Sequence, residues 1–251
     1  MNYRFEVCAN SVASCLAAQE GGADRVELCY GIPEGGTTPS FGCITTARKH
    51  LDIGLNVIIR PRGGDFLYTQ HELDEMEADI HAAIQAGADG LVFGCLTTTG
   101  DIDLSAMQRL MKAAGNHPVT FHRAFDRCRD PHLALRQIEE LGCARILTSG
   151  QQPTAPQGAA LLKALQAEAR SVILMAGCGV NEKNIAQLAA DTGIHEFHFS
   201  AREAFPSQMQ YHNPDVYMGV PGADEDSLMI TTARRVKDTI IALLAHRRKQ
   251  L

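Results

Sequence analysis

The chain has 251 residues, of which 45% are hydrophobic and 21% are charged, and its formal net charge is -6. This length and composition are typical of one large α/β domain, and the negative charge argues against nucleic acid or an anionic membrane as a partner. No run of about 18 apolar residues is present to cross a membrane, and the first residues resemble a strand, not a signal peptide. We therefore expect a cytoplasmic protein. Its eight cysteines form no Cys-x-x-Cys pair and are expected to be mostly free thiols.

Four segments of the chain repeat one pattern, in which a helix ends at a glycine and a strand follows. The glycines are Gly22, Gly87, Gly142 and Gly193, and glycine is typical of the C-terminal end of a helix. Four more strands are predicted between the repeats, over 4–8, 55–60, 119–122 and 172–176. Amphipathic helical stretches follow the strands, for example 11–20, 72–86, 103–114, 131–141, 158–169, 181–190 and 226–246. Eight strand-and-helix units in 251 residues predict a single-domain (β/α)8 TIM barrel over 1–251, with a doubly wound sheet as the alternative.

Alternation along the predicted strands assigns their side chains to two faces, and the face toward the barrel axis is unusually polar. The inward residues include Glu6, Cys8, Arg25, Glu27, Cys29, Arg60, His122, Arg145, Glu196, His198 and Ser200. Unpaired buried charges cost several kcal/mol each, so these side chains must pair with one another or with a ligand. Arg25, Arg145 and Glu196 lie deep and are expected to form structural ion pairs. Toward the C-terminal ends of the strands, where this fold builds its active sites, lie Glu27, Cys29, Arg60, His122, His198 and Ser200.

One function that fits such a barrel mouth is catalysis on a small phosphorylated or anionic metabolite. Glu27 and His122 are candidates for the general acid and base, because both are expected at strand ends that face the same space. The anion would bind to guanidinium groups after the third strand and to the loops after the seventh and eighth strands, the common phosphate site of this fold. The candidate anion-binding residues are Arg60, Arg62, Gly177, Gly179 and Ser200.

Five strings along nearly the whole chain resemble the CutC copper homeostasis family. They are ADRVELC (23–29), IRPRGGDF (59–66), GADGLVFG (87–94), TFHRAFD (120–126) and LTSG (147–150). The resemblance implies a cytoplasmic TIM barrel that is usually a homo-oligomer, is linked to copper tolerance and is able to bind copper. It implies no particular reaction.

Two cysteines offer a copper site at the barrel mouth. Cu(I) prefers thiolate and thioether ligands and accepts imidazole. Cys8 and Cys29 end adjacent predicted strands with the same inward parity, so their thiols are expected to converge, with His122 or Met175 as a third partner. The alternative is that both are small buried hydrophobic residues. The sequence therefore predicts Cu(I) binding at the C-terminal mouth, and catalysis on an anionic metabolite remains the alternative.

A long irregular stretch, 200–225, precedes the last predicted helix and contains three prolines. Long loops in compact domains are commonly lids or interfaces. We expect this loop to contact a second subunit in a homo-oligomer, with a dimer favoured.

Overall fold

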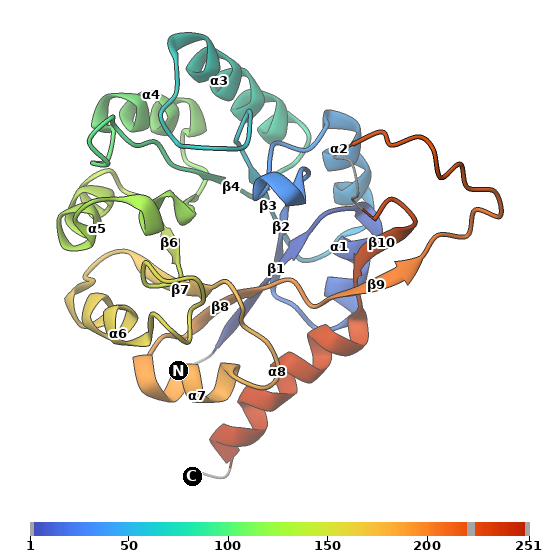
Figure 1. The fold of residues 1–251 in the computed structure, drawn as a ribbon. Coiled ribbons are helices and arrows are strands. Elements are labelled where there is room, and N and C mark those ends of the chain that lie inside the picture. Colours follow the sequence, from blue (N-terminus) through green and yellow to red (C-terminus); the bar gives the residue numbers. More distant parts are fainter. Residues whose placement is uncertain (1–2, 220–223, 249–251) are drawn as a thin grey trace.

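The computed structural model describes residues 3–219 and 224–248, and it shows a closed barrel of eight parallel strands surrounded by helices (Figure 1). The strands are β1 (Arg4–Ala9), β2 (Arg25–Leu28), β3 (Gly54–Ile58), β4 (Gly90–Phe93), β5 (Val119–Phe121), β6 (Arg145–Thr148), β7 (Ile173–Gly177) and β8 (Glu196–Phe199). Because β1 pairs in parallel with both β2 and β8, the sheet closes on itself. The predicted single-domain TIM barrel is confirmed, and the doubly wound alternative is wrong.

The helices lie outside the barrel. They are α1 (Val12–Glu20), α2 (Phe41–His50), α3 (Gln70–Gln85), α4 (Leu104–Ala114), α5 (Pro131–Glu140), α6 (Ala159–Glu168), α7 (Ile185–Thr192) and α8 (Ala233–Arg248), with short 3-10 turns η1 (Ile32–Glu34) and η2 (Arg123–Arg127). Helices α1 to α5 each begin after a residue whose side chain caps the helix. Thr69 and Glu72 form a reciprocal capping box at the start of α3. Within the described residues, no helix combines the length and the apolar composition that a bilayer-spanning helix requires.

The four repeat glycines adopt the backbone conformation that makes glycine necessary there. Their φ angles lie between 73° and 94°, a left-handed region in which a Cβ atom is strained. Each therefore turns the chain from the end of an outer helix into the next barrel strand, as the sequence predicts.

Alternation along the strands separates two apolar regions. Val26, Phe121 and Phe197 face the helices and belong to the main core between barrel and helices. Ile58 and Val92 face the barrel axis and form a small second cluster with Cys29. The predicted inward and outward faces of the strands are confirmed by this division.

The C-terminal region differs from its prediction. Residues Arg202–Pro206 form β9, which pairs antiparallel with β10 (Ser227–Thr231), and the last helix begins at Ala233 instead of residue 226. The backbone N–H of Thr231 donates to the buried hydroxyl of Ser14 on α1, so β10 is held against the barrel. The described part of the connection between the two strands loops outward beyond α2 (Figure 1). We call β9 and β10 the arm. Residues 220–223 of the predicted loop lie outside the described residues.

Candidate functional site

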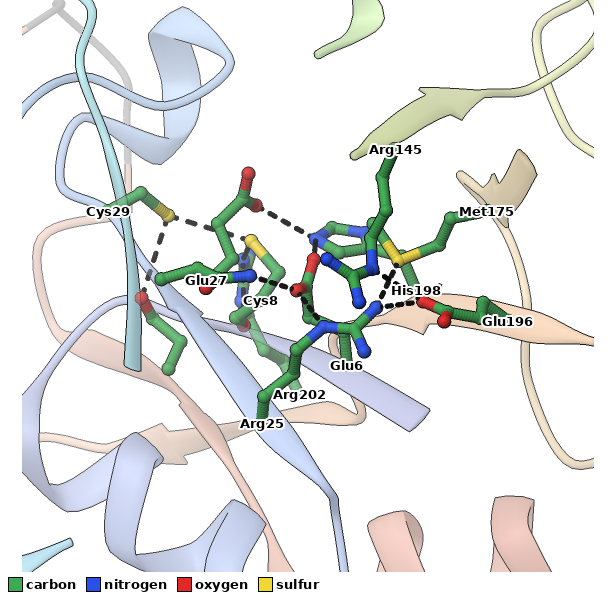
Figure 2. Close-up of polar contacts among 12 residues, drawn as sticks. Glu6, Cys8, Arg25, Glu27, Cys29, Arg145, Met175, Glu196, His198 and Arg202 are labelled. Carbon is green, nitrogen blue, oxygen red and sulfur yellow. Dashed lines mark hydrogen bonds and ion pairs between the residues drawn. The ribbon is translucent and has the colours of Figure 1, made fainter. Parts of the chain in front are cut away.

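A network of paired charges fills the lower part of the barrel interior. Arg25 Nε donates to Glu6 Oε2 at 2.6 Å, and its Nη2 donates to Glu196. Arg145 Nε reaches Glu196 Oε2 at 2.8 Å, and Asn56 Nδ2 reaches Glu6 Oε2 at 2.7 Å. Burial alone would lower the pKa of Arg25, but the carboxylates of Glu6 and Glu196 outweigh burial and raise it. The predicted structural ion pairs of Arg25, Arg145 and Glu196 are confirmed (Figure 2).

Above this network, a cavity of about 540 Å³ opens at the C-terminal ends of the strands. Seven of the candidate site residues from the sequence line it: Cys8, Glu27, Cys29, Arg60, His122, Gly179 and Ser200. Two others, Arg62 and Gly177, do not line it. Gly177 ends β7, where an added Cβ would collide with the side chain of Leu147, so glycine at this position serves close packing beneath the cavity.

The two predicted thiols meet at the floor of the cavity. Cys8 Sγ and Cys29 Sγ lie 3.5 Å apart, and Arg202 Nη2 lies 3.1 Å from Cys8 Sγ (Figure 2). The hydrogen bond with Cys29, together with burial, raises the pKa of Cys8 well above its ordinary value. Without a bound ion, Cys8 is therefore protonated at neutral pH, and a metal that binds to its thiolate must displace that proton.

A buried ion pair lies beside the thiols. His198 Nε2 and Glu27 Oε2 are 2.8 Å apart, and Glu6 Oε1 lies 3.9 Å from the same nitrogen. Burial opposes the charged imidazole, but the charge and hydrogen bond of Glu27 outweigh it and raise the pKa of His198 to about 9. One ligand atom from each of Cys8, Glu27 and His198 lies within 4.8 Å of the other two.

The sequence named different residues as third partners for the thiols. Met175 Sδ accepts a hydrogen bond from Arg25 Nη2 at 3.2 Å and belongs to the lower network. His122 lines the cavity, but it is His198 and Glu27 that lie in the group with Cys8. His198 carried a signal in the sequence, since its inward parity on the last strand is the same as that of Cys8.

His122 is a buried neutral imidazole. Burial, and then the positive charge of Arg60, lower its pKa to about 3. Its Nδ1 accepts from the backbone N–H of Ala124 at 3.3 Å, which places the proton on Nε2. At neutral pH it is therefore a hydrogen-bond donor, and the partner of Glu27 is His198 instead of His122.

The two arginines after β3 point in different directions. Arg60 is buried, and its Nη atoms donate to three backbone carbonyls of the loops after β2 and β3. Arg62 pairs with Glu72 and Asp65 on the outer side of the loop. The two guanidinium groups therefore do not converge on one anion.

Three arginines that were not among the candidates line the cavity: Arg123, Arg202 and Arg235. Arg202 lies two residues beyond Ser200, so the alternation that marked Ser200 could have been extended to it. Arg235 lies in the first turn of α8 and donates to the carbonyl of Arg202 at 2.7 Å. No signal in the sequence connects that turn with the barrel mouth.

The sequence profile of the CutC family matches residues 3–203. The chain belongs to the CutC family. CutC family proteins of Bacteroides thetaiotaomicron and Porphyromonas gingivalis are 65% and 47% identical to it, and each match covers 96% of this chain and 98% of the relative. A solved CutC structure from Streptococcus agalactiae, provisionally described as a copper homeostasis protein, matches with a TM-score of 0.76 at 35% identity, over 79% of this chain and 98% of that one.

The CutC profile covers all eight barrel strands and ends inside β9. The region that the family profile matches therefore includes both thiols, the Glu27–His198 pair and Arg202. Strand β10 and helix α8 lie beyond that region. Phosphoribosylanthranilate isomerase of Thermotoga maritima matches with a TM-score of 0.60 at 10% identity over 97% of this chain and 99% of that one. This likeness shows the barrel fold alone.

Proposed function

We propose that this CutC protein serves copper homeostasis by binding Cu(I) at the barrel mouth through Cys8 and Cys29. The observation that carries the proposal is the 3.5 Å separation of the two sulfur atoms. Two thiolates on one ion lie at most about two metal–sulfur bond lengths apart, roughly 4.6 Å, so a single ion is able to bridge them. Glu27 or His198 would supply a third ligand once their ion pair opens and His198 loses its proton, because their atoms lie within 4.8 Å of Cys8 Sγ and of each other.

The charges around the thiols support a soft monovalent cation. Two thiolates and one Cu(I) carry a net charge of about -1, and Arg202 at 3.1 Å from Cys8 Sγ stabilises that charge. A divalent hard cation prefers several oxygen ligands, and Glu27 already pairs with His198. The donor set thus favours Cu(I) over Mg²⁺ or Ca²⁺.

Anaerobic titration of the reduced protein with Cu(I), against a competing chelator, tests the proposal. We expect one tight site per chain in the wild type and its loss in the Cys8→Ala/Cys29→Ala double variant. The control Cys43→Ala/Cys143→Ala also removes two thiols, from positions that do not line the cavity, and is expected to retain the site. Weak binding that the first double variant leaves unchanged contradicts the proposal.

Acid–base catalysis on an anionic metabolite is the second candidate, and the Glu27–His198 pair favours it. The pair is buried at the floor of a cavity of about 540 Å³, and a carboxylate paired with a protonated imidazole is a common means of moving a proton. In this candidate His198 takes the role that the sequence assigned to His122. Turnover by the double cysteine variant would separate it from copper binding.

We further propose a cytoplasmic homodimer whose contact includes the arm. Free thiols persist in a reducing compartment. Phe205, Leu228 and Met229 of the arm are exposed, and exposed apolar clusters mark contact surfaces. We expect the mass measured by light scattering to be twice the chain mass of 27.2 kDa in the wild type. In Leu228→Asp the measured mass should fall toward that of one chain. A wild-type mass of a single chain contradicts the dimer.

A further inference from the structure

The cavity contains buried hydrogen-bond donors that have no acceptor. Within the described residues, Arg60 Nε, His122 Nε2 and Arg202 Nε are buried and unpartnered, and all three side chains line the same cavity. Arg60 and His122 are only 3% and 4% exposed. Buried donors are nearly always satisfied in folded proteins. Three exceptions around one cavity indicate that a bound molecule supplies the missing acceptors.

The charges of the lining residues identify the sign of that molecule. Arg60 and Arg202 have no carboxylate within 4.0 Å among residues 3–219 and 224–248. Glu27 is the acidic residue of the lining, and His198 already neutralises it. A guanidinium in a partly enclosed site needs a counter-charge. The cavity therefore has an excess of positive charge that an anion would balance.

The size and walls of the cavity exclude a simple ion as its full occupant. Its volume of about 540 Å³ falls within the range of small-molecule sites, ~300–1,000 Å³. Apolar side chains form part of its wall, among them Ile32, Ile58, Phe66 and Phe199. Such a wall suits a carbon skeleton, which a metal ion or inorganic anion lacks.

We propose that the cavity binds a small organic anion that bears a carboxylate or a phosphate. Its charged group lies against Arg202 and Arg60, and its carbon skeleton lies against the apolar wall. The site goes beyond copper binding and requires neither thiol. It also supplies the substrate class for the acid–base candidate, although binding itself does not depend on catalysis.

Isothermal titration calorimetry on the reduced, metal-free protein tests the site by measuring the binding of three probes: ribose 5-phosphate, succinate and inorganic phosphate. We expect one organic probe to bind more tightly than inorganic phosphate, and the probe that binds distinguishes a phosphate from a carboxylate ligand. We expect Arg202→Gln to weaken its binding at least about tenfold, since a charged hydrogen-bond partner is lost. Arg129→Gln is the control, because it removes the same charge from an exposed arginine that pairs with Asp101 outside the cavity.

One further variant keeps the test decisive. Ser200→Phe adds a ring at the cavity wall without removing a charge and is expected to abolish binding even if Arg202→Gln does not fold. Because the titrations use metal-free protein, failure of the copper site leaves this inference intact. The inference is overturned if no organic probe binds at millimolar concentration, if inorganic phosphate binds equally well, or if Arg202→Gln and Arg129→Gln weaken binding equally.

Discussion

The lower layer of the barrel interior and the mouth above it both contain buried arginines, but the two layers differ in whether those arginines have carboxylate partners. In the lower layer, Arg25 contacts the carboxylates of both Glu6 and Glu196, and Arg145 adds a second positive charge to Glu196. At the mouth, Arg60 and Arg202 each retain a buried Nε without an acceptor. In the lower layer Arg25 and Arg145 have carboxylate partners, although Glu6 Oε1 accepts no hydrogen bond, whereas Arg60 and Arg202 at the mouth have no carboxylate partner among the described residues.

This difference separates structural from functional charges. A buried charge whose partners all belong to the chain contributes to the folded state and leaves nothing for a ligand. A buried donor without a partner destabilises the free protein, and a ligand that satisfies it gains the free energy of that contact. Glu6 connects the layers, since its Oε2 binds Arg25 while its Oε1 lies 3.9 Å from His198.

The largest contrast is expected from removing one arginine in each layer. Arg25→Met leaves Glu6 and Glu196 without their shared counter-charge, so we expect the free energy of unfolding to fall by about 3–5 kcal/mol. Arg202→Met removes a guanidinium that has no carboxylate partner, and we expect a change within ~1 kcal/mol. Urea unfolding measures both. Equal losses in the two variants would show that the layers do not differ.

The buried neutral His122 makes the mouth sensitive to acid. Its pKa of about 3 in the folded protein lies below the ordinary value of about 6.5, so the unfolded chain binds an extra proton below pH 6.5. Stability from this residue is present above that pH and is lost progressively as the pH falls toward 3. Between pH 6 and 4, wild type should lose about 1.4 kcal/mol per pH unit more than His122→Asn. Parallel pH profiles of unfolding would refute the assignment of a neutral imidazole.

The Glu27–His198 pair makes stability depend on pH in the opposite direction from His122. Because Glu27 raises the pKa of His198 to about 9, its stabilisation is present below pH 6.5 and is lost as the pH rises through about 9. In an NMR titration, Glu27→Gln should lower the pKa of His198 by one unit or more, about 1.4 kcal/mol. Glu168→Gln, which removes the exposed partner of His132, should leave His198 unchanged. An unaltered pKa in Glu27→Gln would show that the pair does not hold the proton.

Much of the barrel and part of the site could be predicted from local patterns. The glycine repeats placed the strands, and alternation alone brought Cys8 and Cys29 to the same inward face. Alternation does not say which inward residues meet, because that depends on the stagger between strands. The register that sets Cys8 opposite Glu27, and Glu6 opposite His198, arises only when β1 pairs with both β2 and β8.

The remaining errors have other physical causes. Arg62 was expected at the mouth, but Glu72, which also caps α3, holds its guanidinium outside. The stretch from residue 226 was expected to be helical from its apolar residues, yet Leu228 and its neighbours pair with β9 as a strand. Arg235 reaches the cavity from a helix that is remote in sequence from every other lining residue. Tertiary packing decides all three cases.

The smallest expected effect concerns backbone strain at the mouth. Cys178 lines the cavity and has a φ of 75°, a left-handed conformation that costs a residue with a Cβ about 1–2 kcal/mol. Cys178→Gly relieves that strain but loses the contact of Sγ with the carbonyl of Pro153, so unfolding free energy should stay level or rise by up to ~1 kcal/mol. Ala176→Gly, in the buried strand β7, gains no such relief and should lose about 1 kcal/mol. If urea unfolding gives both variants the same loss, the left-handed residue is not strained, and the mouth differs from the lower layer in its charges alone.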